Sequence, residues 1–198
     1  MIKKILQSAG LRQSIILSGG NLFAALFSAA ALILISRRLE PALFGEFTVG
    51  YSLMIILVRI QGIGLTAAIQ KIAGHYFQES DWAKKLSHLL QVTTRYSALV
   101  AGLFLILGVA FSWLIAGLLH VSSPYIIMGS FLFATVTFIF EYIANILQVV
   151  HSFTQSVWMM VLQSVLKLGV AIVIFFGQIH NVLVTFSAFY LTPIFGAI

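Results

Sequence analysis

The sequence contains no cysteine, and it is poor in charged residues and in proline. The absence of cysteine excludes disulfide bonds and metal sites built on thiolates. Charged residues make up only 8% of the 198 residues, and just five of them are acidic. A soluble domain carries about 25% charged residues, which it needs to cover its surface. An ordinary soluble domain is therefore excluded, and lipid is the expected solvent.

Apolar residues fill the chain instead, at 61% of the composition and a mean hydropathy of +1.07. A transmembrane helix needs about 20 apolar residues to cross a hydrocarbon core about 30 Å thick. The pattern predicts an all-α, polytopic membrane protein of about six transmembrane helices, which form a single bundle over residues 1–198. The expected spans are residues 14–36, 44–70, 92–119, 125–150, 156–176 and 182–198, with Pro193 interrupting the last.

Two local patterns predict how these helices pack and where they meet the membrane surface. Small residues recur every four positions in the first span, at Gly20, Ala24 and Ser28, which predicts a seam of close helix packing. Residues 71–95 mix basic and apolar side chains, which indicates an interfacial connection. We expect a short amphipathic helix there, before the third span, with Ser80 as its N-cap.

Lysine and arginine are distributed unevenly along the chain. If the N-terminus is inside, seven of them fall in inner segments and two, Arg37 and Arg38, in an outer loop. The positive-inside rule therefore predicts a cytoplasmic N-terminus. We expect a multi-pass protein of the cell (inner or plasma) membrane. The net charge of +6 does not indicate nucleic-acid binding, because the basic residues form no stripe with interleaved aromatics.

Three ionisable residues, Arg59, Glu141 and Lys167, fall near the middle of predicted spans. A charge at the bilayer centre costs about 2.5–3.5 kcal/mol, so such residues normally face a polar pathway or each other. Two interpretations stay open: an ion pair that locks helices together, or a substrate-binding site. Because two cations face one anion, the site would suit an anionic cargo such as a phosphate or an acidic sugar. We predict Arg59, Lys167 and Glu141 as substrate-binding residues.

The sequence shows no catalytic machinery. It has no phosphate-binding glycine loop and no nucleophile elbow. The histidines fall near predicted interfaces and have no paired i,i+4 metal spacing. They are His75, His88, His120, His151 and His180. We therefore predict no enzyme activity, no cofactor and no metal site.

Two segments go beyond composition. Ile35–Phe47 joins the first two spans and reads ISRRLEPALFGEF, and Gly62–Lys71 closes the second span with GIGLTAAIQK. Together they resemble the N-terminal region of polysaccharide flippases in the multidrug/oligosaccharidyl-lipid/polysaccharide exporter superfamily. The first hairpin of that family often carries Ser-Arg, Leu, Gly-Pro and then Phe-Gly-x-Phe. Glu40 stands where glycine is common in the family.

The resemblance implies a flippase that exports lipid-linked oligosaccharide units for O-antigen of lipopolysaccharide, capsule or exopolysaccharide synthesis. Its cargo would be an undecaprenyl-pyrophosphate-linked glycan. Family members have twelve or fourteen helices in two lobes, so this chain would be the N-terminal lobe and would need a C-terminal lobe or a second copy.

Three alternatives stay open. A multidrug exporter of the same superfamily would favour an acidic lumen, for which the sequence offers only Glu141. A glycan polymerase or ligase would need a large outer loop, and no predicted outer loop is long enough. Because the sequence is still apolar at Ile198, a non-functional truncated product is the third alternative, beside an N-terminal portion of a longer transporter.

Overall fold

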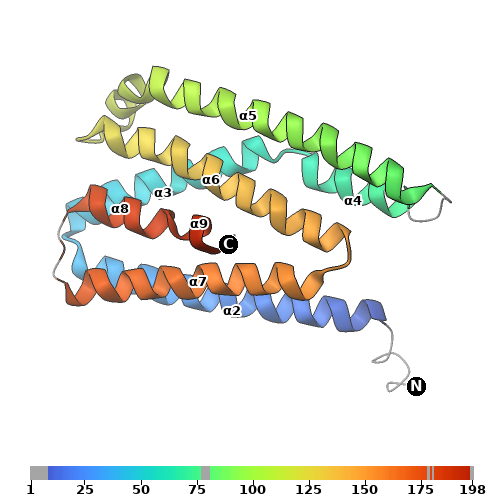
Figure 1. Cartoon of the computed structure of the whole chain (residues 1–198). Helices are drawn as coiled ribbons and strands as arrows, with labels where there is room; N and C mark the ends of the chain where they lie inside the picture. Colours follow the sequence, from blue (N-terminus) through green and yellow to red (C-terminus); the bar gives the residue numbers. More distant parts are fainter. Residues whose placement is uncertain (1–8, 77–80, 178, 180, 197–198) are drawn as a thin grey trace. The chain divides into compact units, whose positions relative to one another are not determined.

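The structure, a computed structural model, describes residues 9–76, 81–177, 179 and 181–196. These residues form helices and the turns that join them, and no strand occurs among them. The helices are α2 (Ala9–Arg38), α3 (Pro41–Gln61), α4 (Leu65–Tyr76), α5 (Trp82–Leu119), α6 (Pro124–Val149), α7 (Phe153–Phe176), α8 (Val182–Tyr190) and α9 (Thr192–Gly196) (Figure 1). The expected all-α class is confirmed.

Five stretches of helix among the described residues are long and apolar enough to cross a membrane. They are Gln13–Arg38, Pro41–Tyr76, Trp82–Leu119, Pro124–Val149 and Phe153–Phe176, with a shorter apolar helix at Val182–Ile194. Large apolar side chains stand exposed along them; Leu99 is 74% exposed and Phe176 is 76% exposed. Such surfaces are stable against lipid and not against water, so the chain has the character of a multi-pass membrane protein.

The second expected span, residues 44–70, is divided into α3 and α4. Gly64 has a φ of 73°, in the left-handed region that glycine enters without steric cost. Just before it, the N–H of Ile63 donates to the carbonyl of Ile60, three residues back, at 3.3 Å. The last α-helical hydrogen bond at the end of α3 runs from the N–H of Gly62 to the carbonyl of Val58 at 3.0 Å, and the α-helical pattern resumes in α4.

α5 is one continuous helix of 38 residues. The sequence indicated a short interfacial helix followed by a separate span over residues 92–119. The two are joined because no glycine or proline interrupts residues 82–101. At 1.5 Å per residue α5 is about 57 Å long, nearly twice the thickness of the hydrocarbon core. The predicted N-cap, Ser80, lies outside the described residues.

The sixth expected span, residues 182–198, is also divided, into α8 and α9. The side chain of Asn181 caps α8 by accepting hydrogen bonds from the N–H groups of Leu183 at 2.9 Å and Val184 at 3.2 Å. Pro193 lies in the first turn of α9, a position where its missing N–H breaks no helical hydrogen bond.

The chain divides into two compact units. The first unit consists of Met1–Pro41 and Ile146–Ile198, and the second unit is Ala42–Asn145. The first contains α2, α7, α8 and α9, whereas the second contains α4, α5 and almost all of α3 and α6. The second unit is therefore continuous in sequence and is inserted into the first.

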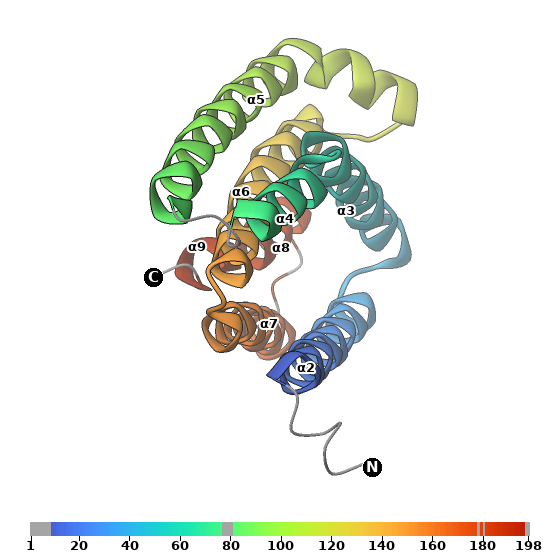
Figure 2. The same cartoon turned by 90° about the vertical axis from the view of Figure 1, so that its right-hand side faces the viewer.

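In the first unit α2 and α7 lie side by side along most of their length (Figures 1 and 2). The hydroxyl of Ser28 donates to that of Ser164 at 3.5 Å, and a Cβ atom at Gly20 would overlap the side chain of Val157. The predicted packing seam is confirmed at Gly20 and Ser28. Because the paired residue numbers rise together, α2 and α7 run parallel.

In the second unit α3 also runs parallel to α6. The N–H of Ser122 donates to the carboxylate of Glu46 at 3.2 Å, and the hydroxyl of Ser130 donates to the carbonyl of Gly50 at 2.9 Å. The paired numbers again rise together from one contact to the next.

α5 runs antiparallel to α6. Gly108 meets Phe131 so closely that a Cβ atom would overlap the ring, and Thr93 lies 2.9 Å from the hydroxyl of Tyr142. Consecutive spans that each cross a membrane alternate in direction. Alternation makes the first and fifth spans parallel, as α2 and α7 are. It makes the second and fourth spans parallel, as α3 and α6 are, and the third and fourth antiparallel, as α5 and α6 are.

Candidate functional site

Polar side chains from α3, α4 and α5 converge on a short stretch of α6 in the second unit. We call this set the polar belt: Arg59 of α3, Thr66 of α4, Thr93 and Thr94 of α5, and Glu141, Tyr142 and Asn145 of α6. The hydroxyls of Thr93 and Thr94 each lie 2.9 Å from the hydroxyl of Tyr142. In apolar surroundings such contacts are held firmly, because the alternative is an unpaired polar group. These contacts therefore hold α5 against α6 at the level of the belt.

The polar belt lies at one end of the apolar segments of α3 and α5. The sequence placed Arg59 near the middle of a span over residues 44–70. Because the helix breaks after Gln61, Arg59 lies instead in the last turn of α3, about 27 Å along a helix about 31 Å long. On α5, the 24 residues that follow Arg95 carry no charge and are long enough to cross the hydrocarbon core. The belt thus coincides with a boundary between apolar and polar sequence.

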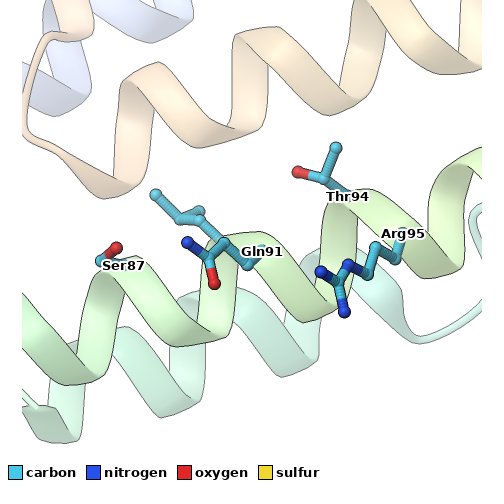
Figure 3. Close-up of a pocket in the computed structure, with 5 residues that line it drawn as sticks. Ser87, Gln91, Thr94 and Arg95 are labelled. Atoms are coloured by element: carbon cyan, nitrogen blue, oxygen red, sulfur yellow. The ribbon is translucent and has the colours of Figure 1, made fainter.

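A groove of about 500 Å³ opens on α5 next to the polar belt (Figure 3). Its lining residues come from successive turns of α5: Ser87, Leu90, Gln91, Thr94 and Arg95. Spacings of three and four residues place these side chains along one side of the helix. The groove therefore presents hydroxyl, amide and guanidinium donors around one leucine.

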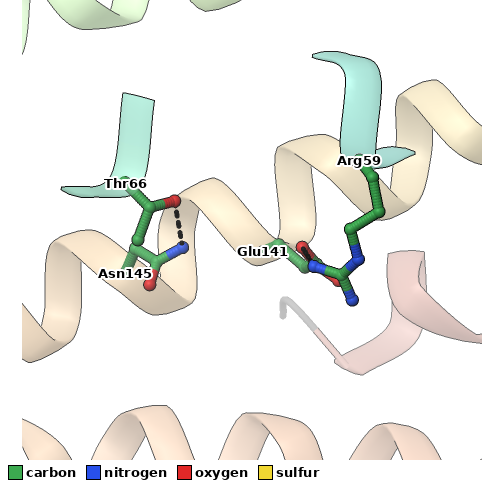
Figure 4. Close-up of polar contacts among 4 residues, drawn as sticks. All are labelled: Arg59, Thr66, Glu141 and Asn145. Atoms are coloured by element: carbon green, nitrogen blue, oxygen red, sulfur yellow. Dashed lines mark hydrogen bonds and ion pairs between the residues drawn. The ribbon is translucent and has the colours of Figure 1, made fainter. Parts of the chain in front are cut away.

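Arg59 and Glu141 form an ion pair across α3 and α6 (Figure 4). Nη1 of Arg59 donates to Oε2 of Glu141 at 3.4 Å, and the two side chains are 71% and 38% exposed. A guanidinium has five N–H donors, so this one long contact uses a small part of its capacity. Exposed pairs of this kind contribute little to stability. The geometry does not favour a firm lock between the helices.

The break between α3 and α4 is flanked by two contacts with α6. Arg59 holds the end of α3 to Glu141, and the amide of Asn145 donates to the hydroxyl of Thr66 in α4 at 3.2 Å (Figure 4). Between them Gln61 is only 2% exposed, and neither polar atom of its amide has a hydrogen-bond partner among the described residues. A buried amide without partners is costly, and water or a ligand that reached it would be stabilised.

Lys167, the third predicted residue, belongs to the first unit. It lies near the middle of α7, half-buried, with Nζ 5.8 Å from the centre of the Phe189 ring. The structure therefore brings Arg59 and Glu141 together within the second unit, whereas Lys167 is part of the other unit.

Sequence reasoning missed Thr93 and Thr94 on α5 and Tyr142 on α6. Thr93, Thr94 and Tyr142 are ordinary residues for a membrane helix, and only their packing reveals them. A usable signal was present: the run Thr93-Thr94-Arg95 stands where α5 changes from charged to uncharged sequence.

The described residues include no group of three or more His, Asp or Glu side chains that could hold a metal ion. Two of the histidines have a structural position, because His120 and His151 end α5 and α6 with positive φ angles of 53° and 63°.

Comparison with protein-family models, with curated proteins and with solved structures finds no match for this chain. Its function therefore has to be argued from its own residues.

Proposed function

We propose that this chain forms one wall of a transporter that moves lipid-linked oligosaccharide units across a membrane for cell-surface polysaccharide synthesis. The cargo would be an undecaprenyl-pyrophosphate-linked glycan, whose pyrophosphate is anionic. Two features support the proposal: the hairpin segment Ile35–Phe47, which resembles that of polysaccharide flippases, and the exposed guanidinium of Arg59. Alternating access needs two helical bundles around a shared site, so a C-terminal lobe or a second copy would supply the other wall.

The observation that carries the proposal is the loosely held Arg59. Its guanidinium contacts Glu141 at 3.4 Å and is 71% exposed. Guanidinium donors match the oxygens of a phosphate in a two-pronged arrangement, which a lysine cannot reproduce. Glu141 would hold the guanidinium between transport cycles and yield it to the more highly charged pyrophosphate.

The charge distribution of the second unit supports an inner-membrane location with the N-terminus in the cytoplasm. Its lysines and arginines all lie at or beyond the polar belt: Arg59, Lys71, Lys84, Lys85 and Arg95. The opposite end carries Glu46, which contacts the start of the Ser122–Pro124 turn. The positive-inside rule assigns the basic end to the cytoplasm. The start of α3 would then lie on the outer side of the membrane, and the end of α2 would lie there too. Because α2 crosses the membrane once, its N-terminal end would be in the cytoplasm.

Replacing Arg59 with glutamine tests the proposal in the natural host. The Arg59→Gln protein should reach the membrane at its normal level, and lipid-linked surface polysaccharide should fall about tenfold or more, since a charge-assisted double contact is lost. Lys71→Gln removes one positive charge from exposed α4 and is the matched control. It should leave the polysaccharide within about twofold of normal.

Two outcomes would contradict the flippase proposal. One is normal surface polysaccharide in an Arg59→Gln strain that makes normal amounts of the protein. The other is loss of resistance to cationic dyes with normal polysaccharide, which would favour the multidrug exporter instead. Arg59→Lys adds a finer comparison, because it keeps the positive charge but loses the two-pronged guanidinium contact. We therefore expect partial export.

A further inference from the structure

α5 extends beyond the hydrocarbon core on its N-terminal side. Residues 96–119 are uncharged and about 36 Å long, which is enough to cross a core about 30 Å thick. Residues 82–95 continue the same helix for about 21 Å more and include Lys84, Lys85 and Arg95. Because charged side chains are costly inside hydrocarbon, this part of α5 must lie in the head-group region and beyond.

The groove on α5 lies at this exit point. Arg95 directly precedes the uncharged stretch, and Ser87 lies two turns further out, about 12 Å along the axis. The head-group region on each side of a bilayer is about 5–8 Å thick, so the groove covers the depth of the lipid phosphates. Ser87, Gln91 and Arg95 of its lining can donate hydrogen bonds, and no acidic side chain belongs to it.

The surface below the groove suits acyl chains. Tyr96, Leu99 and Leu103 follow Arg95 and are 51%, 74% and 53% exposed. Their three- and four-residue spacing sets them on one side of α5. A phosphate at Arg95 would therefore have its acyl chains beside apolar side chains of the same helix.

We propose that the groove lined by Ser87, Gln91, Thr94 and Arg95 binds the head group of an anionic phospholipid of the surrounding bilayer (Figure 3). Arg95 contacts the phosphate, and Gln91 and Ser87 contact the glycerol or head-group hydroxyls further out. Both the shape and the charge support this occupant: the groove combines donors at phosphate depth with an apolar strip beneath them, on the end of the unit that holds all of its lysines and arginines. The proposal does not depend on what the protein transports.

The test uses the purified full chain in detergent, with native mass spectrometry to count bound lipids. The probes are dioleoyl phosphatidylglycerol and dioleoyl phosphatidylcholine, which share acyl chains and differ in charge. The wild-type chain should retain the anionic lipid about tenfold more strongly than the zwitterionic one. Arg95→Gln should remove most of this preference.

Lys84→Gln is the matched control, because it removes the same charge from the same helix outside the groove. It should keep the preference within about twofold of wild type. Gln91→Ala, which changes no charge, should reduce retention of the anionic lipid about two- to threefold and decides the matter if Arg95→Gln lowers thermal stability.

Three results would overturn the proposal. The first is equal retention of the two lipids by the wild-type chain. The second is an equal loss in Arg95→Gln and Lys84→Gln, which would mean attraction to general charge rather than a site. The third is release of the bound lipid by millimolar inorganic phosphate, which would make the groove a site for free phosphate.

Discussion

At the scale of single residues, the backbone of His120 is the clearest source of strain in the second unit. It ends α5 at a φ of 53°, where its N–H donates to the carbonyl of Gly117 at 3.4 Å and that of Val121 to Ala116 at 3.0 Å. A side chain in the left-handed region costs about 1–2 kcal/mol, and glycine avoids this cost.

His120→Gly should therefore stabilise the protein. We expect the free energy of unfolding to rise by about 1 kcal/mol, measured by thermal melting in detergent with tryptophan fluorescence as the signal. His88→Gly, inside α5, is the control and should destabilise by about 1 kcal/mol, because glycine is a poor helix former. Equal shifts from both substitutions would show that the end of α5 is not strained.

Charged residues were found from the sequence more readily than their depth in the membrane. Arg59 and Glu141 stand out because a charge is rare in an apolar run. The sequence did not fix where α3 ends, since Gly62 and Gly64 permit a break without requiring one. Tyr142 could not be found at all, because its partners lie on α5, nearly 50 residues earlier in the chain. The type of each residue can be read from the sequence, whereas its side-chain contacts depend on the fold.

At the scale of helices, two adjacent glycines of α2 give opposite predictions. A Cβ atom at Gly20 would overlap Val157 of α7, whereas one at Gly19 would meet nothing within 4 Å. Gly19→Ala should stabilise by up to about 1 kcal/mol through helix propensity. Gly20→Ala should destabilise by about 1–3 kcal/mol, because α2 and α7 must separate. Thermal melting of the two variants in the same detergent decides between these effects, and equal stabilisation would refute the seam.

Helix existence could be predicted, and helix limits could not. Runs of about 20 apolar residues predicted the spans, because a helix must be this long and this apolar to cross a bilayer. The join between residues 82–91 and the third span was missed for a physical reason. Hydropathy changes sharply near Arg95, but helix propensity does not. The helix therefore continues through this point, because backbone hydrogen bonding depends on propensity and not on hydropathy.

At the scale of the whole molecule, the two ends of α5 should face opposite sides of the membrane. The chain has no native cysteine, so a single introduced cysteine reports its own location. Ser122→Cys, just beyond the end of α5, should react with a membrane-impermeant maleimide in intact cells. Lys84→Cys, near the start, should react only after the cells are opened, because the basic end is expected inside. Labelling of both in intact cells would contradict the spanning of α5.

The pairing of helices within the two compact units was not visible in the sequence. The first unit joins Ser28 to Ser164, 136 residues apart, and no local pattern reports a partner at that distance. The small-residue seam on α2 predicted a close neighbour but could not say which helix it would be.

That separation has a consequence for the order of events during synthesis. At about 5–20 residues per second, the partner of Ser28 leaves the ribosome about 7–27 s after Ser28 itself. During that interval α7, the helix that contacts Gly20 and Ser28 of α2, has not yet been made. The second unit, whose contacts are all contained in one continuous stretch, can assemble in the meantime. The contacts within the second unit can therefore form before α2, the first of the described helices to be made, meets its partner α7.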